Sequence, residues 1–412
     1  MRSVSRVDDL MKSNKPVLVH ITTVPMSLRF LEGQVRFMMS KGLDVHAICS
    51  PGQMADTFSR REGVVVHPVR MNRNIKPVHD LYSLFCLWRM LLALQPQIVH
   101  AHTPKGGLLG MLGSWLARTP VRIYHVHGLP LMTARGIKRP VLRLTERVAC
   151  LLANQVICVS NSLREAVVDS GVCVAEKVKV LANGSINGID SICRFNPERV
   201  GDVRSKVRSQ SGIADQDLVI GFVGRIVLDK GIVELVEAWR VLREEFPQAH
   251  LLVVGPFESH DPLPRGSESV LRNDPRVHLT GDVDNVAPFY AAMDLLVLPS
   301  HREGLGLAAL EASAMRLPVI ATRIPGCIDA VIEGETGLLI PAGDAQALVE
   351  AVKQYVGHDE LRKGHGSAGR ARVLTDFQPE VLWEATYQEY RRLLEEGGIS
   401  IDHHPARDMG HE

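Results

Sequence analysis

The seven cysteines of this 412-residue chain form no C-x-x-C pair and are scattered from Cys49 to Cys327. This spacing excludes a typical zinc ribbon and gives no sign of a disulfide framework, so a reducing compartment is the simpler expectation. Residues 1–15 are polar and mixed in charge, and they lack the apolar core of a signal peptide. We therefore expect a cytoplasmic protein.

Long apolar runs are also missing. The longest, residues 81–94 and 108–117, are shorter than the roughly 20 residues that a membrane-spanning helix needs, and the first contains Arg89. The G-x-G-x-x-G fingerprint of dinucleotide binding is absent from the apolar run and turn at residues 218–231. These absences argue against a membrane span and against a nicotinamide-dependent enzyme.

The net charge of +1 hides an asymmetry between the two halves of the chain. Residues 1–185 carry 24 Lys+Arg against 11 Asp+Glu, net +13, and the remainder carries 23 against 35, net −12. An anionic partner, usually a membrane surface or a nucleic acid, is therefore expected for the first half. Basic and apolar residues alternate at helical spacing in residues 135–147, which suits anionic lipid headgroups. A solvated helix face is the alternative interpretation.

Length and composition fit a soluble protein of two domains, with 45% hydrophobic and 23% charged residues. Short apolar runs alternate with amphipathic segments, which is typical of βαβ units and a parallel sheet. The first series of runs is at residues 16–21, 45–49, 64–68, 98–102, 121–127, 155–159 and 177–181. After a more polar stretch, the second series is at residues 218–224, 249–255, 276–279, 295–299 and 318–322.

The sequence thus predicts an α/β fold with two doubly wound, Rossmann-like domains in tandem, facing a central cleft. Ligands of such sheets bind beyond the carboxyl ends of the strands. We predict a flexible N-terminus, two domains, a helix that crosses back towards the first domain, and a flexible tail. Their bounds are residues 1–15, 16–190, 191–375, 376–396 and 397–412.

Arg225 and Lys230 follow the predicted strand at residues 218–224. Two cations at the carboxyl end of a strand suit a diphosphate, because Arg forms paired charge-assisted hydrogen bonds and Lys adds a point charge. Two ordinary surface cations are the alternative. Gly255 and Val283 lie at the ends of the next two predicted strands, where backbone groups could bind the edge of a base.

Glu303 and Glu311 stand on either side of a turn and a helix start that follow the strand at residues 295–299. A strand, a turn and a helix in this order aim backbone N–H groups at an anion. Glycosidase carboxylates lie about 5 to 9.5 Å apart, whereas a turn plus a helix rising about 1.5 Å per residue should separate these two further. We therefore expect them to bind two ends of one elongated ligand.

Histidines and aspartates at strand ends raise the question of a metal. His100, His102, His125 and His127 could suggest zinc, but no Cys or carboxylate completes a known ligand spacing. Hydrogen bonding to a substrate, or packing within the sheet, is the preferred interpretation. Asp282 and Asp284 form a D-x-D, a pattern that holds a divalent metal in another sugar-transferring fold, yet aspartates are common in turns after strands. No metal site is predicted.

With these residues assembled, the chain closely resembles the retaining glycosyltransferases of family 4, which have the GT-B fold. Over nearly all of the second domain the motifs match in order and spacing: Gly224-Arg225 with Lys230, Gly255, Glu303-Gly304 to Glu311-Ala312, residues 318–322 with Gly326, and residues 337–339. The first domain is similar to the capsule and exopolysaccharide branch, whose members extend lipid-linked sugars. That similarity rests on residues 23–25, residues 99–107 and His127-Gly128.

The resemblance implies a role for each matched residue. Arg225 and Lys230 would hold the donor diphosphate, Glu311 the ribose and Glu303 the transferred sugar, with His127 against the reacting centre. The implied catalytic residues are His127, Glu303, Arg225 and Lys230; the implied donor-binding residues are Arg225, Lys230, Gly255, Val283, Glu303, Gly304, Gly306, Leu307 and Glu311. The cations would stabilise the leaving nucleoside diphosphate, so neither a metal nor another cofactor is expected.

Two departures from the family pattern concern specificity. Residues 26–30 read Met-Ser-Leu-Arg-Phe where many relatives have a Gly-Gly pair, so acceptor contacts there are not assigned. Ile328 and Asp329 stand where relatives often have Arg and Glu, so the loop near the donor sugar is expected to differ in specificity.

The predicted activity is transfer of a hexosyl or N-acetylhexosaminyl group from a UDP-sugar to a lipid-diphosphate-linked saccharide. Such acceptors, undecaprenyl diphosphate derivatives among them, serve capsule, exopolysaccharide, O-antigen and other glycan assembly. We expect a peripheral protein on the inner face of the cell membrane, docked through its basic first domain, with no nucleic-acid partner. A sugar-nucleotide epimerase or phosphorylase and a non-catalytic binding protein are the alternatives. The sequence does not specify the sugar, linkage, nucleotide base or oligomeric state.

Overall fold

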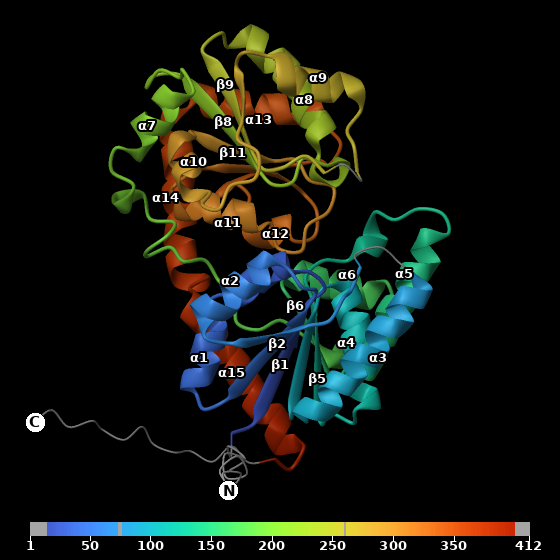
Figure 1. Ribbon diagram of the computed structural model, residues 1–412. Helices are drawn as coiled ribbons and strands as arrows, with labels where there is room; N and C mark the ends of the chain where they lie inside the picture. Colours follow the sequence, from blue (N-terminus) through green and yellow to red (C-terminus); the bar gives the residue numbers. More distant parts are fainter. Residues whose placement is uncertain (1–14, 73–75, 259–260, 400–412) are drawn as a thin grey trace, which may run out of the picture. The chain divides into compact units, whose positions relative to one another are not determined.

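The computed structural model describes residues 15–72, 76–258 and 261–399 (Figure 1). The flexible ends predicted at residues 1–15 and 397–412 therefore lie outside the described residues, apart from residues 15 and 397–399. The chain divides into two compact units. The first contains residues 1–125, 148–155 and 385–412, and the second contains residues 126–147 and 156–384.

A seven-stranded sheet has the order β3-β2-β1-β4-β5-β6-β7. Its strands are β1 (Val17–Ile21), β2 (Asp44–Cys49), β3 (Val65–Pro68), β4 (Ile98–His102), β5 (Val121–Val126), β6 (Gln155–Cys158) and β7 (Val178–Lys179). The pairs β1–β2, β1–β4, β2–β3, β4–β5 and β6–β7 are parallel. Every residue of β4 is buried, as a central parallel strand covered on both faces requires. All seven apolar runs predicted in this half form strands.

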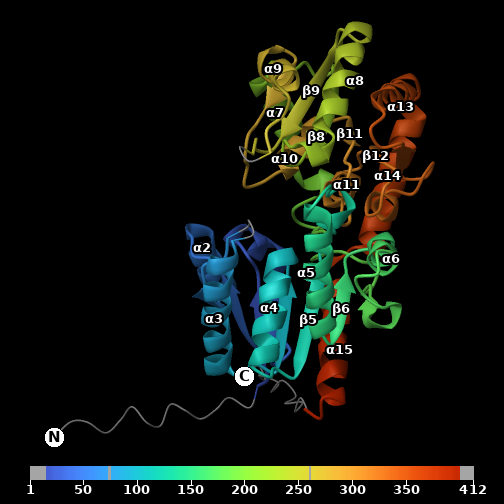
Figure 2. The same ribbon diagram turned by 90° about the vertical axis from the view of Figure 1, so that its right-hand side faces the viewer.

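Helices connect these strands. They are α1 (Gln34–Ser40), α2 (Gln53–Glu62), α3 (Pro77–Leu94), α4 (Pro104–Leu116), α5 (Lys138–Leu152) and α6 (Asn161–Asp169), with a 3₁₀ turn, η1 (Pro25–Leu31). The helices α3 and α4 pack side by side (Figure 2). Both begin with proline, whose missing N–H is not needed in a first helical turn.

The register of the central strands places histidines of neighbouring strands side by side. His20 of β1 lies beside His100 of β4, and His102 of β4 lies beside His125 of β5. Side chains alternate along a strand, so His100 and His102 share one face of the sheet. On that face the final helix, α15 (Pro379–Glu396), brings the hydroxyl of Tyr390 to within 2.6 Å of Nδ1 of His100.

The second sheet has six strands in the order β10-β9-β8-β11-β12-β13. They are β8 (Leu218–Val223), β9 (Ala249–Val254), β10 (Val277–Leu279), β11 (Leu295–Leu298), β12 (Val319–Thr322) and β13 (Gly337–Ile340), paired in parallel. Five of them were predicted. The edge strand β13 was not predicted, although residues 338–340 are apolar and the strand is as long as β11 and β12.

Helices pack around this second sheet and complete its core. They are α7 (Val203–Gln210), α8 (Ile232–Glu245), α9 (Arg265–Asn273), α10 (Ala287–Ala292), α11 (Leu307–Ala314), α12 (Cys327–Ala330), α13 (Ala345–Gly357) and α14 (Asp359–Asp376). The core includes Phe222 of β8, Trp239 of α8 and Tyr355 of α13. Trp239 satisfies its indole N–H by donating to Asp274 at 3.0 Å. The strand order reverses between β8 and β11, and the loops after these two strands are where a ligand is expected.

Candidate active site

Lys230 and Glu303 lie in the two loops that follow β8 and β11. After β8 the chain passes through the 3₁₀ turn η5 (Leu228–Lys230) into α8. Gly231, between them, has a φ of 69°, and a Cβ atom there would lie 1.9 Å from the carbonyl oxygen of Pro299, directly after β11. Glycine alone permits this approach, which sets Lys230 against the neighbouring loop.

Lys230 and Glu303 form a salt bridge at this point. Nζ of Lys230 is 2.5 Å from Oε1 of Glu303, and the hydroxyl of Ser300 donates to the same oxygen at 2.8 Å. The side chains of Lys230 and Glu303 are 20% and 11% exposed, so solvent ions screen the pair only weakly. Arg302 and Asp229, 2.6 Å apart, join the same two loops a second time. Two loops from separate strands thus hold a cation and a carboxylate together.

Glu311 lies in α11, which begins directly after Gly306. The hydroxyl of Tyr290, from α10, donates to Oε2 of Glu311 at 2.8 Å. Burial raises the pKa of Glu311, and the hydrogen bond from Tyr290 and the charge of Arg194 oppose that rise. Glu311 is therefore a half-buried residue whose carboxylate is kept ionised in part by the hydroxyl of Tyr290.

Arg225, Gly255 and Val283 follow the adjacent strands β8, β9 and β10, in that order across the sheet. Arg225 is 43% exposed and is paired with Glu258 at 3.1 Å. Gly255 forms an isolated bridge with Gly281, two residues before Val283. The predicted donor residues thus form a row at one edge of the sheet, but Arg225 contacts a different carboxylate from the one that holds Lys230.

His127 lies close to the turn that carries Glu303. A Cβ atom on Gly304 would lie 2.1 Å from the carbonyl oxygen of His127, so the two backbones are in direct contact. Ser160, the N-cap of α6, donates its hydroxyl to the carbonyl oxygen of Gly304 at 2.7 Å. Two of the predicted catalytic residues are therefore next to Gly304: the backbone of His127 contacts it in space, and Glu303 precedes it in the chain.

Asp329 binds the N-terminus of α6. Its carboxylate accepts hydrogen bonds from the backbone N–H groups of Asn161 at 3.1 Å and Ser162 at 3.2 Å, and from the Ser162 hydroxyl. The oxygen of that hydroxyl accepts from the N–H of Gly326 at 2.7 Å. A carboxylate is stabilised at a helix N-terminus by unpaired N–H groups and by the helix dipole. This aspartate, at a position that departs from the family pattern, connects α6 to the start of α12.

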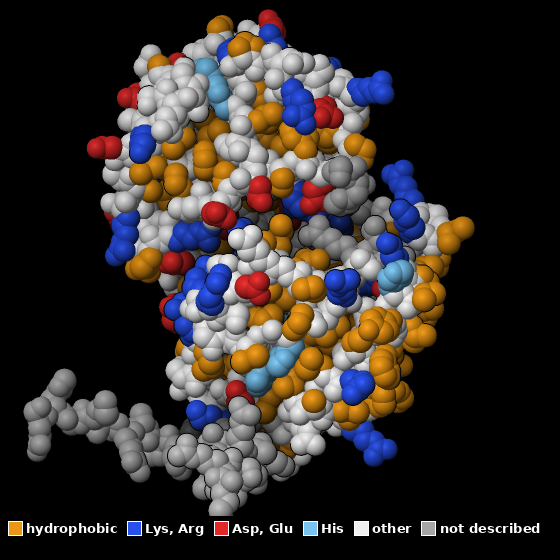
Figure 3. Space-filling model, viewed as in Figure 1, with side chains coloured by type: hydrophobic (Ala, Val, Ile, Leu, Met, Phe, Trp, Pro, Cys, Tyr) orange, Lys and Arg blue, Asp and Glu red, His pale blue; other side chains and the backbone are white. Residues whose placement is uncertain are grey.

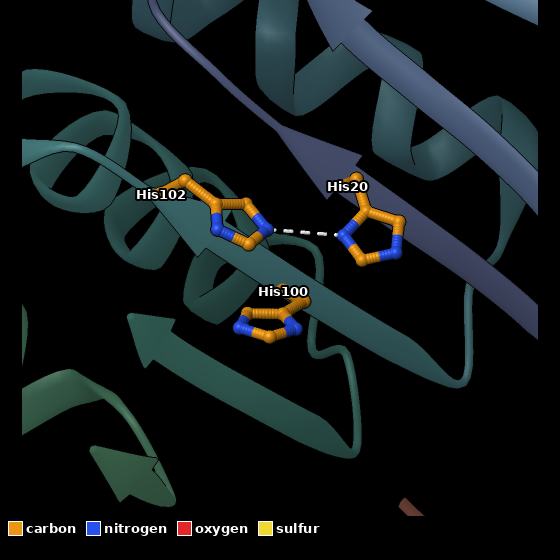
Figure 4. Close-up of side chains that lie close together, drawn as sticks. All are labelled: His20, His100 and His102. Atoms are coloured by element: carbon orange, nitrogen blue, oxygen red, sulfur yellow. Dashed lines mark hydrogen bonds between the residues drawn. The ribbon is translucent and has the colours of Figure 1, made fainter. Parts of the chain in front are cut away.

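A cluster of buried imidazoles lies where β1, β4 and β5 are adjacent (Figure 4). Nδ1 of His20 is 3.0 Å from Nε2 of His102, and the rings of His100 and His102 stack with centroids 4.3 Å apart. Burial lowers the pKa values of His20 and His125 to about 3. The ring nitrogens of His20, His100 and His102 also lie within 4.8 Å of one another, close enough to bind one metal ion. That no metal binds here stays a prediction.

Several contacts in the site were not indicated by the sequence. Ser300 could have been singled out, because it directly follows the predicted strand and precedes Glu303 by three residues. Tyr290 and Ser162 could not, since they lie 21 and 167 positions from their partners Glu311 and Asp329. The D-x-D aspartates, Asp282 and Asp284, are exposed after β10.

Both halves of the chain match glycosyltransferase families. Residues 27–184 match the Glycosyl transferase 4-like domain, and residues 217–358 match the Glycosyl transferases group 1. The capsular polysaccharide biosynthesis glycosyltransferase CapM of Staphylococcus aureus is 34% identical over 386 residues, which cover 94% of this chain and 99% of CapM. The chain belongs to the family 4, or group 1, glycosyltransferases. It is a glycosyltransferase of capsule or related polysaccharide biosynthesis.

A more distant relative and two solved structures are also similar to this chain. The UDP-Gal:alpha-D-GlcNAc-diphosphoundecaprenol alpha-1,3-galactosyltransferase of Escherichia coli is 27% identical over 82% of this chain and 87% of its own length. Among solved structures, Anabaena HepE in complex with UDP and glucose has a TM-score of 0.74 at 20% identity, covering 91% of this chain and 99% of HepE. The lipopolysaccharide glycosyltransferase WaaG has a TM-score of 0.70 at 16% identity, with 90% and 99% covered. These likenesses confirm the predicted GT-B fold.

Proposed function

We propose that this glycosyltransferase moves a sugar from a UDP-sugar to a lipid-diphosphate-linked saccharide and retains the anomeric configuration. The observation that carries the proposal is the contact of Lys230, Glu303 and Ser300 where the order of the second sheet reverses. A cation beside a carboxylate suits a ligand in which a diphosphate adjoins a sugar, because the ammonium binds phosphate and the carboxylate accepts from hydroxyls.

The proposed donor and acceptor are of the kinds named for a relative and a structural neighbour of this chain. The Escherichia coli relative is named for UDP-Gal and a diphosphoundecaprenol acceptor, and HepE was solved with UDP-glucose. In the proposed complex Arg225 and Lys230 bind the diphosphate, Glu303 the sugar hydroxyls and Glu311 the ribose. Backbone N–H groups at the start of α11, near Gly306 and Leu307, face the β-phosphate.

The proposed reaction exchanges one bond at C1 of the sugar for another. The bond from C1 to the β-phosphate oxygen breaks while the acceptor oxygen bonds to C1 on the same face, and the acceptor proton passes to the leaving phosphate. Arg225 and Lys230 stabilise the charge that develops on UDP, so the reaction is proposed to need no metal. His127 lies against the transferred sugar in this proposal.

We also propose that the enzyme is peripheral on the inner face of the cell membrane. Most of the basic segment at residues 135–147 lies in α5. Ile137, directly before this helix, is 85% exposed, and Leu144 within it is 63% exposed. A helix with apolar and basic side chains on its surface can lie on anionic headgroups. Such binding would bring the enzyme to a lipid-linked acceptor.

A screen of nucleotide sugars by thermal stabilisation tests the donor site, because a ligand that binds only the folded state raises its apparent stability. We expect a UDP-sugar to raise the midpoint of the wild type and of Glu237→Gln, an exposed control on α8. The same sugar should stabilise Glu303→Gln and Arg225→Ala much less. Equal stabilisation of all four proteins would contradict the assignment.

A further inference from the structure

The outer surface of α3 and α4, which lie within the first unit, is exposed and yet apolar. Seven large side chains there are exposed: Val78, Leu81, Tyr82, Phe85 and Leu92 from α3, and Trp115 and Leu116 from α4. We call this set the α3–α4 apolar surface. It surrounds a hollow of about 500 Å³ whose walls include Leu84 and Trp88. Figure 3 shows hydrophobic side chains gathered over α3. Contiguous apolar surfaces of this kind mark protein or membrane contacts.

The composition of α3 explains why this surface exists. The helix buries Ser83, Leu87 and Leu91, which are spaced four residues apart and form a single stripe. Its remaining positions are also largely apolar, and Val78 and Leu81 are 81% and 69% exposed. A helix that is apolar on all sides is normally surrounded by apolar material. One side of α3 packs on the protein, and the opposite side needs a second apolar neighbour.

The charges near the α3–α4 apolar surface favour an anionic neighbour. Residues 70–118 contain six Lys+Arg and a single acidic residue, Asp80, which is paired with Lys105 at 2.7 Å. Lys76, Arg89 and Arg118 are exposed. A bilayer with anionic headgroups offers both acyl chains for the apolar side chains and negative charge for the basic ones. Tyr and Trp, both represented in the surface, are enriched at the interface between lipid and water.

We propose that the α3–α4 apolar surface is where this glycosyltransferase enters the headgroup and acyl boundary of an anionic bilayer. In the described part of the chain, no helix combines the length and apolarity that crossing a bilayer demands. The insertion is therefore shallow, of the order of the 5–10 Å typical of interfacial helices. The inference rests on the proposed function only because a lipid-linked acceptor gives the enzyme a reason to bind a membrane. It differs from docking through residues 135–147, which acts mainly by charge.

Vesicle binding distinguishes insertion of the α3–α4 apolar surface from charge-driven docking of residues 135–147. The wild type, Leu81→Ser/Phe85→Ser and the control Val174→Ser/Ile192→Ser, whose side chains are exposed in the second unit, are sedimented with vesicles of phosphatidylcholine and phosphatidylglycerol. We expect the first variant to bind at least about tenfold more weakly and the control to bind like the wild type, since only the first loses apolar groups that enter lipid. At high salt the charge-driven part weakens, and the difference should persist. Equal binding by all three proteins would overturn the proposal.

Tryptophan fluorescence gives a second readout of depth. Trp88 and Trp115 lie in α3 and α4, whereas Trp239 is buried in the second unit and Trp383 donates to Asn187. Lipids brominated on their acyl chains should quench the wild type when vesicles are added, and quench Trp88→Phe/Trp115→Phe far less. Absence of quenching, together with self-association that Leu81→Ser/Phe85→Ser abolishes, would make the surface a dimer contact and refute insertion. Neither assay uses donor or acceptor, so failed transfer would leave this inference standing.

Discussion

The buried histidine cluster makes the stability of the protein depend on pH in a defined direction. Burial lowers the pKa of His20 to about 3, with the charge of His125 adding to the effect, and burial alone lowers that of His125 to about 3. The ordinary value is 6.5. Between pH 6.5 and about 3 the unfolded chain therefore binds protons that the folded protein does not, and stability must fall as the pH falls through this window.

The size of the effect follows from the two pKa values. One pKa unit corresponds to about 1.4 kcal/mol, and pH 5 lies about 1.5 units below the unfolded value. Each histidine should therefore cost about 2 kcal/mol of unfolding free energy between pH 8 and pH 5. Replacing His20 by Gln removes one of the two contributions, whatever it does to stability at pH 8.

Urea unfolding, followed by tryptophan fluorescence at pH 8 and at pH 5, measures this difference. We expect His20→Gln to lose about 2 kcal/mol less than the wild type when the pH is lowered. The matched control is His79→Gln, an exposed histidine on α3, which should lose as much as the wild type. If His20→Gln and the wild type lose the same stability, the cluster does not stay neutral on folding and the reasoning is refuted.

Three further substitutions test the contacts of the site. Gly304→Ala would set a methyl group against the carbonyl oxygen of His127 and should cost about 1–3 kcal/mol in urea unfolding, whereas Gly364→Ala, with nothing within 4 Å, should cost nothing. Tyr290→Phe removes a hydrogen bond that keeps the pKa of Glu311 down. In calorimetry UDP should therefore bind this variant more weakly than the wild type, and the loss of affinity should be larger at pH 6 than at pH 8. An equal loss of affinity at both pH values would argue against this role of Tyr290. Asp329→Ala should speed amide hydrogen exchange at residues 161–162 about tenfold, because it frees two backbone donors. Asp329→Asn should have an intermediate effect. Unchanged exchange would mean that these hydrogen bonds do not hold the start of α6.

The parallel sheets could be predicted because buried strands have a strong sequence signal. The residues of β4 and β8 are apolar or buried throughout, so each reads as a short run between amphipathic segments. The edge strand β13 also has an apolar run, at residues 338–340, so it too could have been predicted. The ends of the strands could also be predicted, and with them the edge at which Arg225, Lys230 and Glu303 lie.

The pairing of those residues could not be predicted, since it depends on contacts between distant parts of the chain. Lys230 meets Glu303 because Gly231 approaches Pro299. Arg225 pairs instead with Glu258, a carboxylate that no motif marks.

The α3–α4 apolar surface was equally hidden in the sequence. The apolar runs at residues 81–94 and 108–117 were recognised, but periodicity alone does not tell which of two apolar helix faces is packed on the protein. Only the positions of Leu87 and Leu91 in the core leave Leu81 and Phe85 outside.

The central claim is that Lys230 and Glu303 bind the diphosphate and the sugar of the donor. Its most direct test is the rate of sugar transfer from the stabilising UDP-sugar to a lipid-diphosphate acceptor, measured for the wild type, Lys230→Ala, Glu303→Gln and Glu237→Gln. We expect a loss of at least about a hundredfold in the first two variants, because each removes a charged partner of the transition state, and none in the third. Transfer at the wild-type rate by Lys230→Ala and Glu303→Gln would contradict it.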